Sequence, residues 1–308
     1  AYDIALVTGV QTCALPISSG EITIFHNSKK IGTRDIPAGY YQLHQNGIYH
    51  FNKKNYQVES IIKTQNGANA YLKKSDEIQK RTIPIVKTSL TQVSEKKSIK
   101  KEIDSTTTKI TLRYGLIDMN RTITGYLKGN YNDSADKFET INGDSISTWN
   151  NFNWNSKHYC TSIFIPSEFG TKIKSDVKNS IVTDSKIHTI THVLVNASKI
   201  LTKSESNDID AYYEDGVIHL FDNTSDGYNG CSKMIYENFE KIMDTCFDLV
   251  NECDCPVDPK QKKAVSEGEE WGGCPKCTFT TNYCQTKNKK LSKNEALEFF
   301  SIFKREIK

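Results

Sequence analysis

The C-terminal sixty residues of this 308-residue chain contain a cysteine cluster that restricts the fold more than any other feature. Five of the nine cysteines lie there, at Cys253, Cys255, Cys274, Cys277 and Cys284. Disulfide-stabilised proteins distribute cysteines through small secreted domains, whereas C-x-C and C-x-x-C pairs in a larger chain favour a metal site. The cluster therefore predicts a metal-stabilised C-terminal domain in a reducing compartment.

Four thiolates suit zinc, which binds sulfur ligands in a closed tetrahedron at structural sites. Cys274 and Cys277 form a C-x-x-C turn, and Cys284 lies seven residues further on. Cys253 and Cys255 compete for the remaining position, and Cys255 is preferred because it lies outside the periodicity of the preceding helix and is followed by proline. The predicted ligands of a structural Zn2+ ion are therefore Cys255, Cys274, Cys277 and Cys284, with Cys253 as the alternative.

A redox-active C-x-x-C pair and cysteines without a metal are the alternatives to structural zinc. A redox pair needs a thioredoxin-like βαβ context and a reactive thiol at a helix N-terminus, and no such pattern precedes Gly272. A catalytic zinc site would keep an open position and would normally use histidine or carboxylate ligands. Cys160, Cys231 and Cys246 stand alone in the sequence, so we expect them to be small buried hydrophobic residues.

The first seventeen residues read as a technical artefact. Val7–Ile17 back-translates directly into a common short-read sequencing adapter, and Ala1–Ile4 resembles the primer segment that precedes this adapter. A signal peptide would need a cationic n-region and a small-residue cleavage site, and neither is present. We therefore exclude residues 1–17 from the fold and expect that the natural sequence upstream of residue 18 is missing.

The first half of the remaining chain is predicted to be rich in β-strands. Residues 18–93 contain short alternating apolar runs separated by turn residues such as Asn66-Gly67, and they predict a β-rich accessory region. Residues 94–109 are rich in Lys, Ser and Thr, which predicts a linker or a long exposed loop. Strand patterns resume over 110–180, on both sides of an asparagine-rich stretch.

Residues 181–308 change to a helical period. Apolar residues recur at helical spacing over Ile187–Leu201 and over Cys231–Val250, and the second, longer helix leads into the cysteine cluster. The tetrad Ser292-Lys-Asn-Glu295 fits a capping box at the start of a last helix. The predicted fold class is α+β, with a β-rich N-terminal part followed by an α/β zinc-binding domain that has a long helix before the cysteines.

Three weaker patterns each have a functional and a structural interpretation. His188 and His192 have the i, i+4 spacing of metal ligands, but HEXXH is absent and partly buried histidines are favoured. Asp222–Gly227 resembles a fragment of a calcium-binding loop without its closing glutamate, so a turn is predicted. The aromatic residues between Tyr40 and Tyr56 are suited to stacking on nucleobases, but strand alternation assigns most of them to the core.

Charge and catalytic motifs narrow the function only a little. The net charge of +3 does not identify a nucleic-acid-binding protein, because phosphate binding requires clustered Lys and Arg. Glutamates interleave with the lysines of the C-terminal tail, so a solvated helix face is as good an interpretation there as a phosphate contact. No Walker A motif, catalytic triad order or paired-carboxylate motif occurs, so no catalytic residue is predicted. No apolar run approaches the ~20 residues that cross a bilayer, and we expect a soluble, cytoplasmic protein.

The order of these features resembles the C-terminal region of MrfA-like DEAD/DEAH-box helicases. The resemblance is carried by HTITHVLVNASKIL, by VIHLFDNTSDGYNGCSKMIYENF, and by the run from the long helix through CDC and GGCPKC to LSKNEA. It extends over residues 19–305, because the upstream segment is similar to the β-rich region between motor and zinc domain in that family. The sequence departs from the family in the long insertion Pro256–Gly273 and in the separation of Gly227 from Gly230.

The resemblance implies a superfamily 2 DNA helicase of the DNA-repair type, with DNA that includes a single-stranded region as its partner. Its two RecA-like motor domains would bind ATP and Mg2+, and they would be missing from this chain, whose own status as an enzyme stays open. The zinc ligands carry over to Cys274 and Cys277, to the preceding Cys253/Cys255 pair and to the later Cys284. The alternative within the wider family is a motorless DNA-binding or scaffolding subunit that partners a helicase in antiphage defence.

Overall fold

The computed structural model describes residues 20–304, except for residues 37, 93–98, 105–108, 134–136, 147–151, 166–184, 206–207, 225–226, 267–270 and 281–290. For residues 92, 99–104, 109 and 185 it describes the backbone alone. The adapter-like residues 1–17 lie outside the described residues. The chain divides into two compact units, residues 1–83 and 84–308. Within the described part of the chain, no helix is long and apolar enough to cross a membrane.

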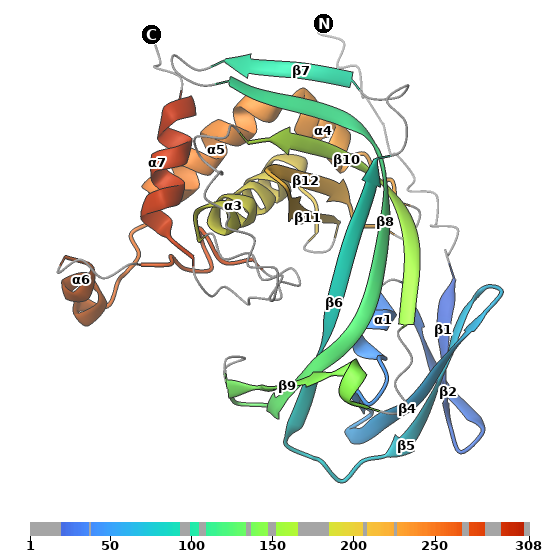
Figure 1. Cartoon of the computed structure of the whole chain (residues 1–308). Coiled ribbons are helices and arrows are strands. Elements are labelled where there is room, and N and C mark those ends of the chain that lie inside the picture. The colour runs from blue at the N-terminus through green and yellow to red at the C-terminus, as the bar shows by residue number, and fades with distance from the viewer. Residues whose placement is uncertain are drawn as a thin grey trace, which may run out of the picture. The chain divides into compact units, whose positions relative to one another are not determined.

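The N-terminal unit is a five-stranded sheet with a short helix, α1 (Ala38–Gln42), against one face (Figure 1). In the order β2-β1-β5-β4-β3, the strands are β2 (Lys29–Asp35), β1 (Glu21–His26), β5 (Gly67–Lys74), β4 (Lys54–Thr64) and β3 (Ile48–Phe51). All neighbours are antiparallel except β1 and β5, which are parallel. A Cβ atom on Gly39 would lie 2.8 Å from Cδ1 of Ile22, so glycine permits the close packing of α1 on the sheet.

Two tight turns connect hairpins of this unit. Asn27-Ser28 joins β1 to β2, and Asn52-Lys53 joins β3 to β4. All four residues have positive φ angles, between 48° and 61°, as two-residue hairpin turns of type I′ require. Asparagine tolerates this conformation better than most residues, which explains its presence at the first position of both turns.

The C-terminal unit is built on a curled sheet with the strand order β11-β12-β10-β8-β6. These strands are β11 (Ile209–Glu214), β12 (Val217–Asp222), β10 (Phe152–Phe164), β8 (Lys109–Asn130) and β6 (Lys80–Gln92). The 22-residue strand β8 bends along its length (Figure 1). It also pairs with β7 (Ile99–Asp104) and with β9 (Glu139–Asn142). A 3-10 turn, η3 (Gly143–Ser145), follows β9. The Tyr212 hydroxyl donates a hydrogen bond of 2.9 Å to the Thr88 carbonyl, which links the first strand of this order to the last.

The stretch 94–109, predicted as a linker, contains β7. Residues 99–104 pair antiparallel with residues 109–114 of β8. Among the described residues, β8 is the partner strand of β7, and lysines are common on edge strands, where they oppose pairing with further strands. The boundary between the two compact units also comes earlier in the sequence than this stretch, between Ile83 and Pro84.

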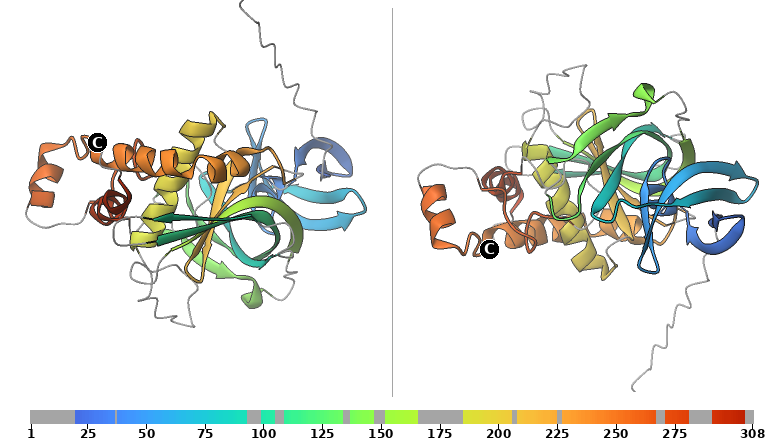
Figure 2. Two further views of the ribbon diagram at one scale, coloured as in Figure 1. Left: turned by 90° about the horizontal axis from the view of Figure 1, so that it is seen from above. Right: turned by 90° about the horizontal axis from the view of Figure 1, so that it is seen from below.

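Four helices form a layer against one face of this sheet (Figures 1 and 2). They are α3 (Ser185–Thr202), α4 (Cys231–Glu237), α5 (Phe239–Asn251) and α7 (Lys293–Phe303). The hydrophobic core between the layers includes Leu112, Ile163, Leu220, Ile190, Val193, Phe239, Phe299 and Phe300. A fifth helix, α6 (Pro259–Ser266), has no buried residue and projects away from this layer (Figure 2).

The α+β class predicted from the sequence is confirmed, whereas the short helices α1 and α6 were not predicted and one predicted helix is divided. The single helix expected over 231–250 is divided at Asn238 into α4 and α5. At the start of α7, the Ser292 hydroxyl accepts the Glu295 amide at 3.3 Å, as the capping box predicts. The Ser292 amide donates to Oγ1 of Thr189 at 2.8 Å, which ties this cap to α3.

Candidate metal centre

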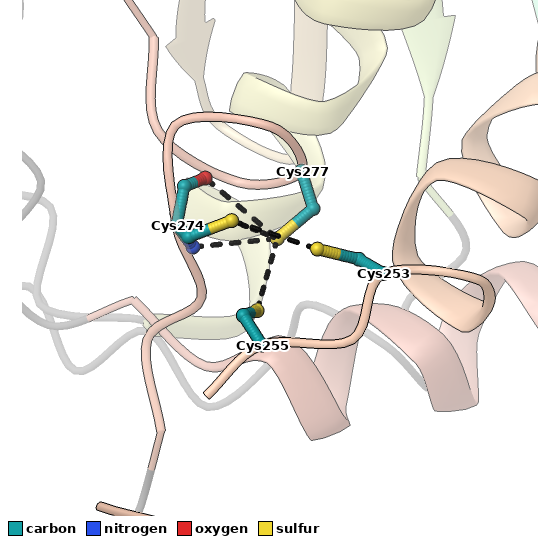
Figure 3. Close-up of side chains that lie close together, drawn as sticks. All are labelled: Cys253, Cys255, Cys274 and Cys277. Carbon is teal, nitrogen blue, oxygen red and sulfur yellow. Dashed lines mark hydrogen bonds between the residues drawn. The ribbon is translucent and has the colours of Figure 1, made fainter. Parts of the chain in front are cut away.

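The side chains of four cysteines point toward one another in the C-terminal unit (Figure 3). The sulfur atoms of Cys253, Cys255, Cys274 and Cys277 all lie within 4.8 Å of one another. The Sγ–Sγ distances are 3.5 Å for Cys253–Cys274, 3.7 Å for Cys255–Cys277 and 3.8 Å for Cys274–Cys277. A disulfide would need ~2.0 Å. Four sulfurs at ~2.3 Å from a tetrahedral zinc ion lie about 3.8 Å apart, so these thiols are spaced as a zinc site requires.

The first cysteine pair follows the end of α5. The helix ends at Asn251, and the Glu252 amide closes its last turn by donating to the Asp248 carbonyl at 2.9 Å. Cys253 and Cys255 therefore both lie in the loop beyond the helix, so the helical period gives no reason to separate them. Successive residues of an extended loop point to opposite sides, and the C-x-C spacing turns both thiols to the same side.

The second pair is held in a tight knuckle. The carbonyl of Cys274 accepts the amides of Cys277, Thr278 and Phe279, each at 3.1 Å. Gly273 has a φ of +102°, and a Cβ atom there would lie 2.0 Å from Oγ1 of Thr278. Only glycine is compatible with this position, which gives the Gly-Gly before the C-x-x-C pair a structural reason.

Several N–H groups donate to the sulfur atoms. The Trp271 indole donates to Sγ of Cys255 at 3.3 Å, the Cys274 amide to Sγ of Cys277 at 3.3 Å, and the Lys276 amide to Sγ of Cys274 at 3.4 Å. Such donors stabilise thiolates, the form in which cysteine binds metal. Burial, in contrast, raises the pKa of the Cys277 thiol to about 12. A bound dication would offset this cost, because the metal favours the deprotonated thiol.

The knuckle is fastened to α3 through its backbone. Nδ2 of Asn196 donates to the carbonyls of Cys277 and Phe279 at 3.0 and 2.9 Å, and Nδ1 of His192 donates to the Thr278 carbonyl at 3.1 Å. His188 packs edge-on against His192, with ring centroids 4.4 Å apart. Both histidines are buried and do not belong to the cysteine cluster, which agrees with their structural interpretation from the sequence.

The ammonium group of Lys293, in the first turn of α7, fastens the other half of the site. It donates to the carbonyls of Cys253 and Cys255 at 2.6 and 3.1 Å. Trp271, Asn196 and Lys293 were not singled out in the sequence, because their partners lie on distant segments. The tryptophan directly before the glycines of the knuckle is the one local signal that points to such a role.

The structure brings together three of the four ligands predicted from the sequence, Cys255, Cys274 and Cys277. The fourth position of the cluster is occupied by Cys253, the named alternative, while Cys284 lies outside the described residues. No second group of three or more His, Cys, Asp or Glu side chains suited to a metal is found among the described residues.

Asp222, the first residue of the segment 222–227 that resembles a calcium-binding loop, caps the N-terminus of α4. The buried carboxylate of Asp222 accepts the amide of Ser232 at 2.6 Å and those of Asn229 and Gly230 at 3.1 Å. These amides precede or begin α4, so the carboxylate satisfies donors at the helix N-terminus and interacts favourably with its dipole. The prediction of a turn over 222–227 agrees with the described part of this loop.

Comparisons with known proteins place this geometry in a class of zinc-binding domains. Residues 190–278 match the family model of the MrfA Zn-binding domain. An uncharacterized protein of Methanocaldococcus jannaschii, MJ1572.1, is 27% identical to this chain over an alignment of 121 residues. The match covers 36% of this chain and 93% of that protein. The described fold is α+β, and the part of the chain that matches the MrfA Zn-binding model contains all four clustered cysteines.

A solved structure of the DUF1998 helicase MrfA shares the fold. The crystal structure of MrfA bound to DNA matches 93% of this chain with 17% identity and a TM-score of 0.52. A second crystal structure, of MrfA bound to DNA and AMPPNP, matches 92% of this chain with 17% identity and a TM-score of 0.47. The chain spans about a third of the MrfA chain, 34% and 31% respectively. The resemblance to an MrfA-like C-terminal region is therefore confirmed at the level of the fold.

Proposed function

We propose that this chain is the accessory and zinc-binding part of an ATP-dependent DNA helicase of the DEAD/DEAH-box type. The observation that carries the proposal is the cluster of four thiols at zinc-site spacing inside a domain that matches the MrfA Zn-binding model. The helicase MrfA, whose fold the chain shares, has been crystallised with DNA and with AMPPNP. In the proposal, ATP and Mg2+ are bound by motor domains of the parent protein, which acts in DNA repair in the cytoplasm.

The zinc ion in this proposal has a structural role. Four thiolates close the tetrahedral shell and leave no position for water or substrate. A catalytic zinc site, in contrast, keeps such a position open. The N–H groups around Cys255, Cys274 and Cys277 hold the ligands in place, and the loop carbonyls are fastened to α3 and α7. The ion would therefore join the end of α5 to the knuckle and hold both against the helix layer.

The choice of the fourth ligand is tested with a matched pair of variants. We expect one zinc ion per chain in the purified protein, released by thiol modification and measured by elemental analysis. Cys253→Ser should lower the zinc content or affinity strongly, since a ligand is lost, whereas Cys284→Ser should keep one zinc ion per chain. Zinc loss in Cys284→Ser with retention in Cys253→Ser would assign the site to the set first predicted from the sequence. Absence of zinc from the wild type would refute the metal centre.

The second candidate is a motorless subunit that binds DNA or acts as a scaffold for a helicase in antiphage defence. One observation favours it: the matched stretch makes up 93% of the M. jannaschii protein, so a protein with little beyond such a region exists. Sequencing the complete gene separates the candidates. A Walker A motif and a DEAH-type box upstream support the helicase, because ATP hydrolysis needs both, and an upstream region without them supports the motorless subunit.

A further inference from the structure

Positive charge is concentrated in the N-terminal unit. Residues 20–83 contain ten Lys and Arg side chains against five Asp and Glu, a net charge of +5. Residues 84–308 contain thirty Lys and Arg against thirty-one Asp and Glu. The small total of +3 hides this asymmetry. Since phosphate groups are bound by an excess of basic side chains, a surface for nucleic acid is favoured on the N-terminal unit over the zinc-binding unit.

One face of the five-stranded sheet carries a pair of stacked aromatic rings. Ile22, Ile24 and Ala70 point to the buried face, and the residues that alternate with them point to the opposite one. Phe25 and Tyr71 are directly paired across the parallel strands β1 and β5 on this opposite face. Their ring centroids are 5.5 Å apart, with 19° between the ring planes.

The stacked pair is not part of the core. Both rings are only partly buried, in contrast to the residues of the buried face. The neighbours of the pair along the two strands are polar, Thr23 on β1 and Asn69 on β5. On β4, Ser60 lies opposite Tyr71, and Ile62, opposite Asn69, is an apolar side chain that is 54% exposed on the same face. A face that combines exposed rings with polar side chains suits a ligand that has both flat rings and polar edges.

Two lysines flank the rings. Lys30 is the cross-strand partner of Phe25 on β2, and Lys73 follows Tyr71 by two residues on the same face of β5. Their ion pairs are long: 3.8 Å from Lys30 to Glu21 and 3.9 Å from Lys73 to Glu59, with all four side chains about half exposed. Exposed ion pairs of this kind contribute little to stability, so either ammonium group can exchange its carboxylate for a phosphate at little cost.

We propose that this surface, defined by Phe25, Tyr71, Lys30 and Lys73 and named here the β1–β5 face, binds single-stranded DNA. An unpaired base stacks on the outer side of the ring pair, and the lysines contact the phosphates on either side of that base. Stacking of this kind accepts every base, and it excludes duplex DNA, whose bases are already stacked. The inference rests on the proposed function for its choice of DNA as the partner, and it adds the location of the contact and the strand state.

A second run of aromatic rings in the chain serves as a control surface. In the C-terminal unit, Tyr228 packs edge-on against Tyr159, which stacks on Tyr114, and Tyr228 is 51% exposed. This run lies in a unit without excess positive charge. Tyr228→Leu therefore removes an exposed ring without altering the β1–β5 face.

The test uses the full chain, loaded with zinc, and fluorescence anisotropy. The probes are a fluorescein-labelled twelve-residue oligothymidine and a blunt duplex of the same length, each titrated at several salt concentrations. We expect tighter binding of the single strand by the wild type and a loss of about tenfold or more in Phe25→Leu/Tyr71→Leu. Tyr71→Phe should bind like the wild type because it keeps the ring, and Tyr228→Leu should also bind like the wild type.

The lysines are tested by the dependence on salt. Lys30→Gln/Lys73→Gln should reduce the slope of log affinity against log salt by about 1.4, because each phosphate contact on a single strand contributes ~0.7. A slope equal to that of the wild type would overturn the assignment of these two lysines. Lys30→Gln/Lys73→Gln and Tyr71→Phe both keep the two aromatic rings, so they test the proposal even if removal of both rings impairs folding.

A cross-link on the unmodified chain gives an independent readout. Irradiation with an oligonucleotide that carries 5-iodouracil should attach DNA to the peptides that contain Phe25 or Tyr71. Cross-links confined to other segments, or wild-type affinity in the folded double-ring variant, overturn the β1–β5 face while leaving DNA binding by the protein in place. Wild-type protein that binds neither probe refutes DNA binding in the proposed function as well. If the double-ring variant changes self-association and not DNA affinity, the face is a protein contact and the proposal fails.

Discussion

Zinc removal should loosen the cysteine loops without unfolding the helix layer. The helices α3, α5 and α7 share an apolar core that includes Val193, Cys246 and Phe299, and none of these side chains depends on the metal. The knuckle and the C-x-C loop, by contrast, contribute few side chains to that core. The perturbation is therefore expected to act on the loop around Cys253 and on residues 271–280, rather than on the whole C-terminal unit.

The magnitude follows from the contacts of the loops. Asn196 and Lys293 each donate two hydrogen bonds to loop carbonyls, and His192 donates one. At ~0.5–1.5 kcal/mol each, these five bonds contribute about 3–7 kcal/mol. Ordering the ten knuckle residues costs about 10–20 kcal/mol, at ~1–2 kcal/mol for each backbone. A zinc ion that contributes ~10–16 kcal/mol closes this difference, whereas the hydrogen bonds alone do not.

Amide hydrogen exchange before and after zinc chelation measures this effect. We expect the amides of Cys277, Thr278 and Phe279 to lose protection, because their shared acceptor is the Cys274 carbonyl. Amides in the middle of α5 should keep theirs. Protection of the knuckle that is unchanged by chelation would show that the metal does not hold the loop. Loss of protection throughout α3, α5 and α7 would show that the apolar core is not independent of zinc.

Three further predictions concern single side chains. Gly273→Ala should greatly weaken zinc binding, because its Cβ would lie 2.0 Å from Oγ1 of Thr278; a chelator competition that gives wild-type affinity would refute this. Trp271→Phe removes the N–H donor to Cys255 and should lower zinc affinity by ~10-fold or more, measured in the same competition, while the melting temperature of the loaded protein changes little. Burial lowers the pKa of His158 to about 4. Between pH 6.5 and pH 4 this histidine therefore gains a proton in the unfolded state alone, so the free energy of unfolding should fall as the pH is lowered through this range. In urea denaturation at pH 7 and pH 5, His158→Gln should show a smaller fall than the wild type, and an equal fall in both proteins would contradict the assignment.

The elements with strong local signals were predictable from the sequence. The helical period over residues 187–201 corresponds to α3, and the Ser292 cap begins α7. The break between α4 and α5 at Asn238 was not predictable, because the apolar period continues through it. Strand β7 was missed for a similar reason: its lysine-rich sequence has no apolar alternation, and only its pairing with β8 defines it.

The choice among the five C-terminal cysteines shows what spacing alone cannot decide. The sequence favoured Cys255 over Cys253 because Cys253 lies nearer to the helix. In the structure α5 ends before both residues, and both thiols turn into the cluster. Ligand choice depends on where the chain leaves the helix and how the loop turns, and a difference of one residue in the helix end changes the answer.

The ring pair of the β1–β5 face was not predicted because it is formed by two strands that are distant in the sequence. Phe25 and Tyr71 belong to strands that are separated by two hairpins in the sequence, and they become neighbours only through the parallel pairing of β1 with β5. In the sequence, the aromatic residues between Tyr40 and Tyr56 were the candidates for stacking on nucleobases. Tyr49 on β3 and Tyr56 on β4 are buried, as strand alternation predicted for most of this group. Tyr40 is buried as well, but it lies on helix α1 and not on a strand.

The long insertion Pro256–Gly273 separates the two cysteine pairs without disrupting the cluster, and loop entropy explains how. Cys255 and Cys274 border the insertion, and both contribute a thiol to the cluster. Within it, the Asp258 carboxylate accepts the amides of Lys260 and Gln261 at 2.7 and 3.3 Å and caps α6, which stands free of the helix layer (Figure 2). Each doubling of a flexible loop costs only ~0.6 kcal/mol in closure entropy, far less than the ~10–16 kcal/mol of a structural zinc ion. A metal that fixes both ends of the loop therefore makes its length nearly neutral for stability, so the departure from the family spacing is compatible with an intact zinc site.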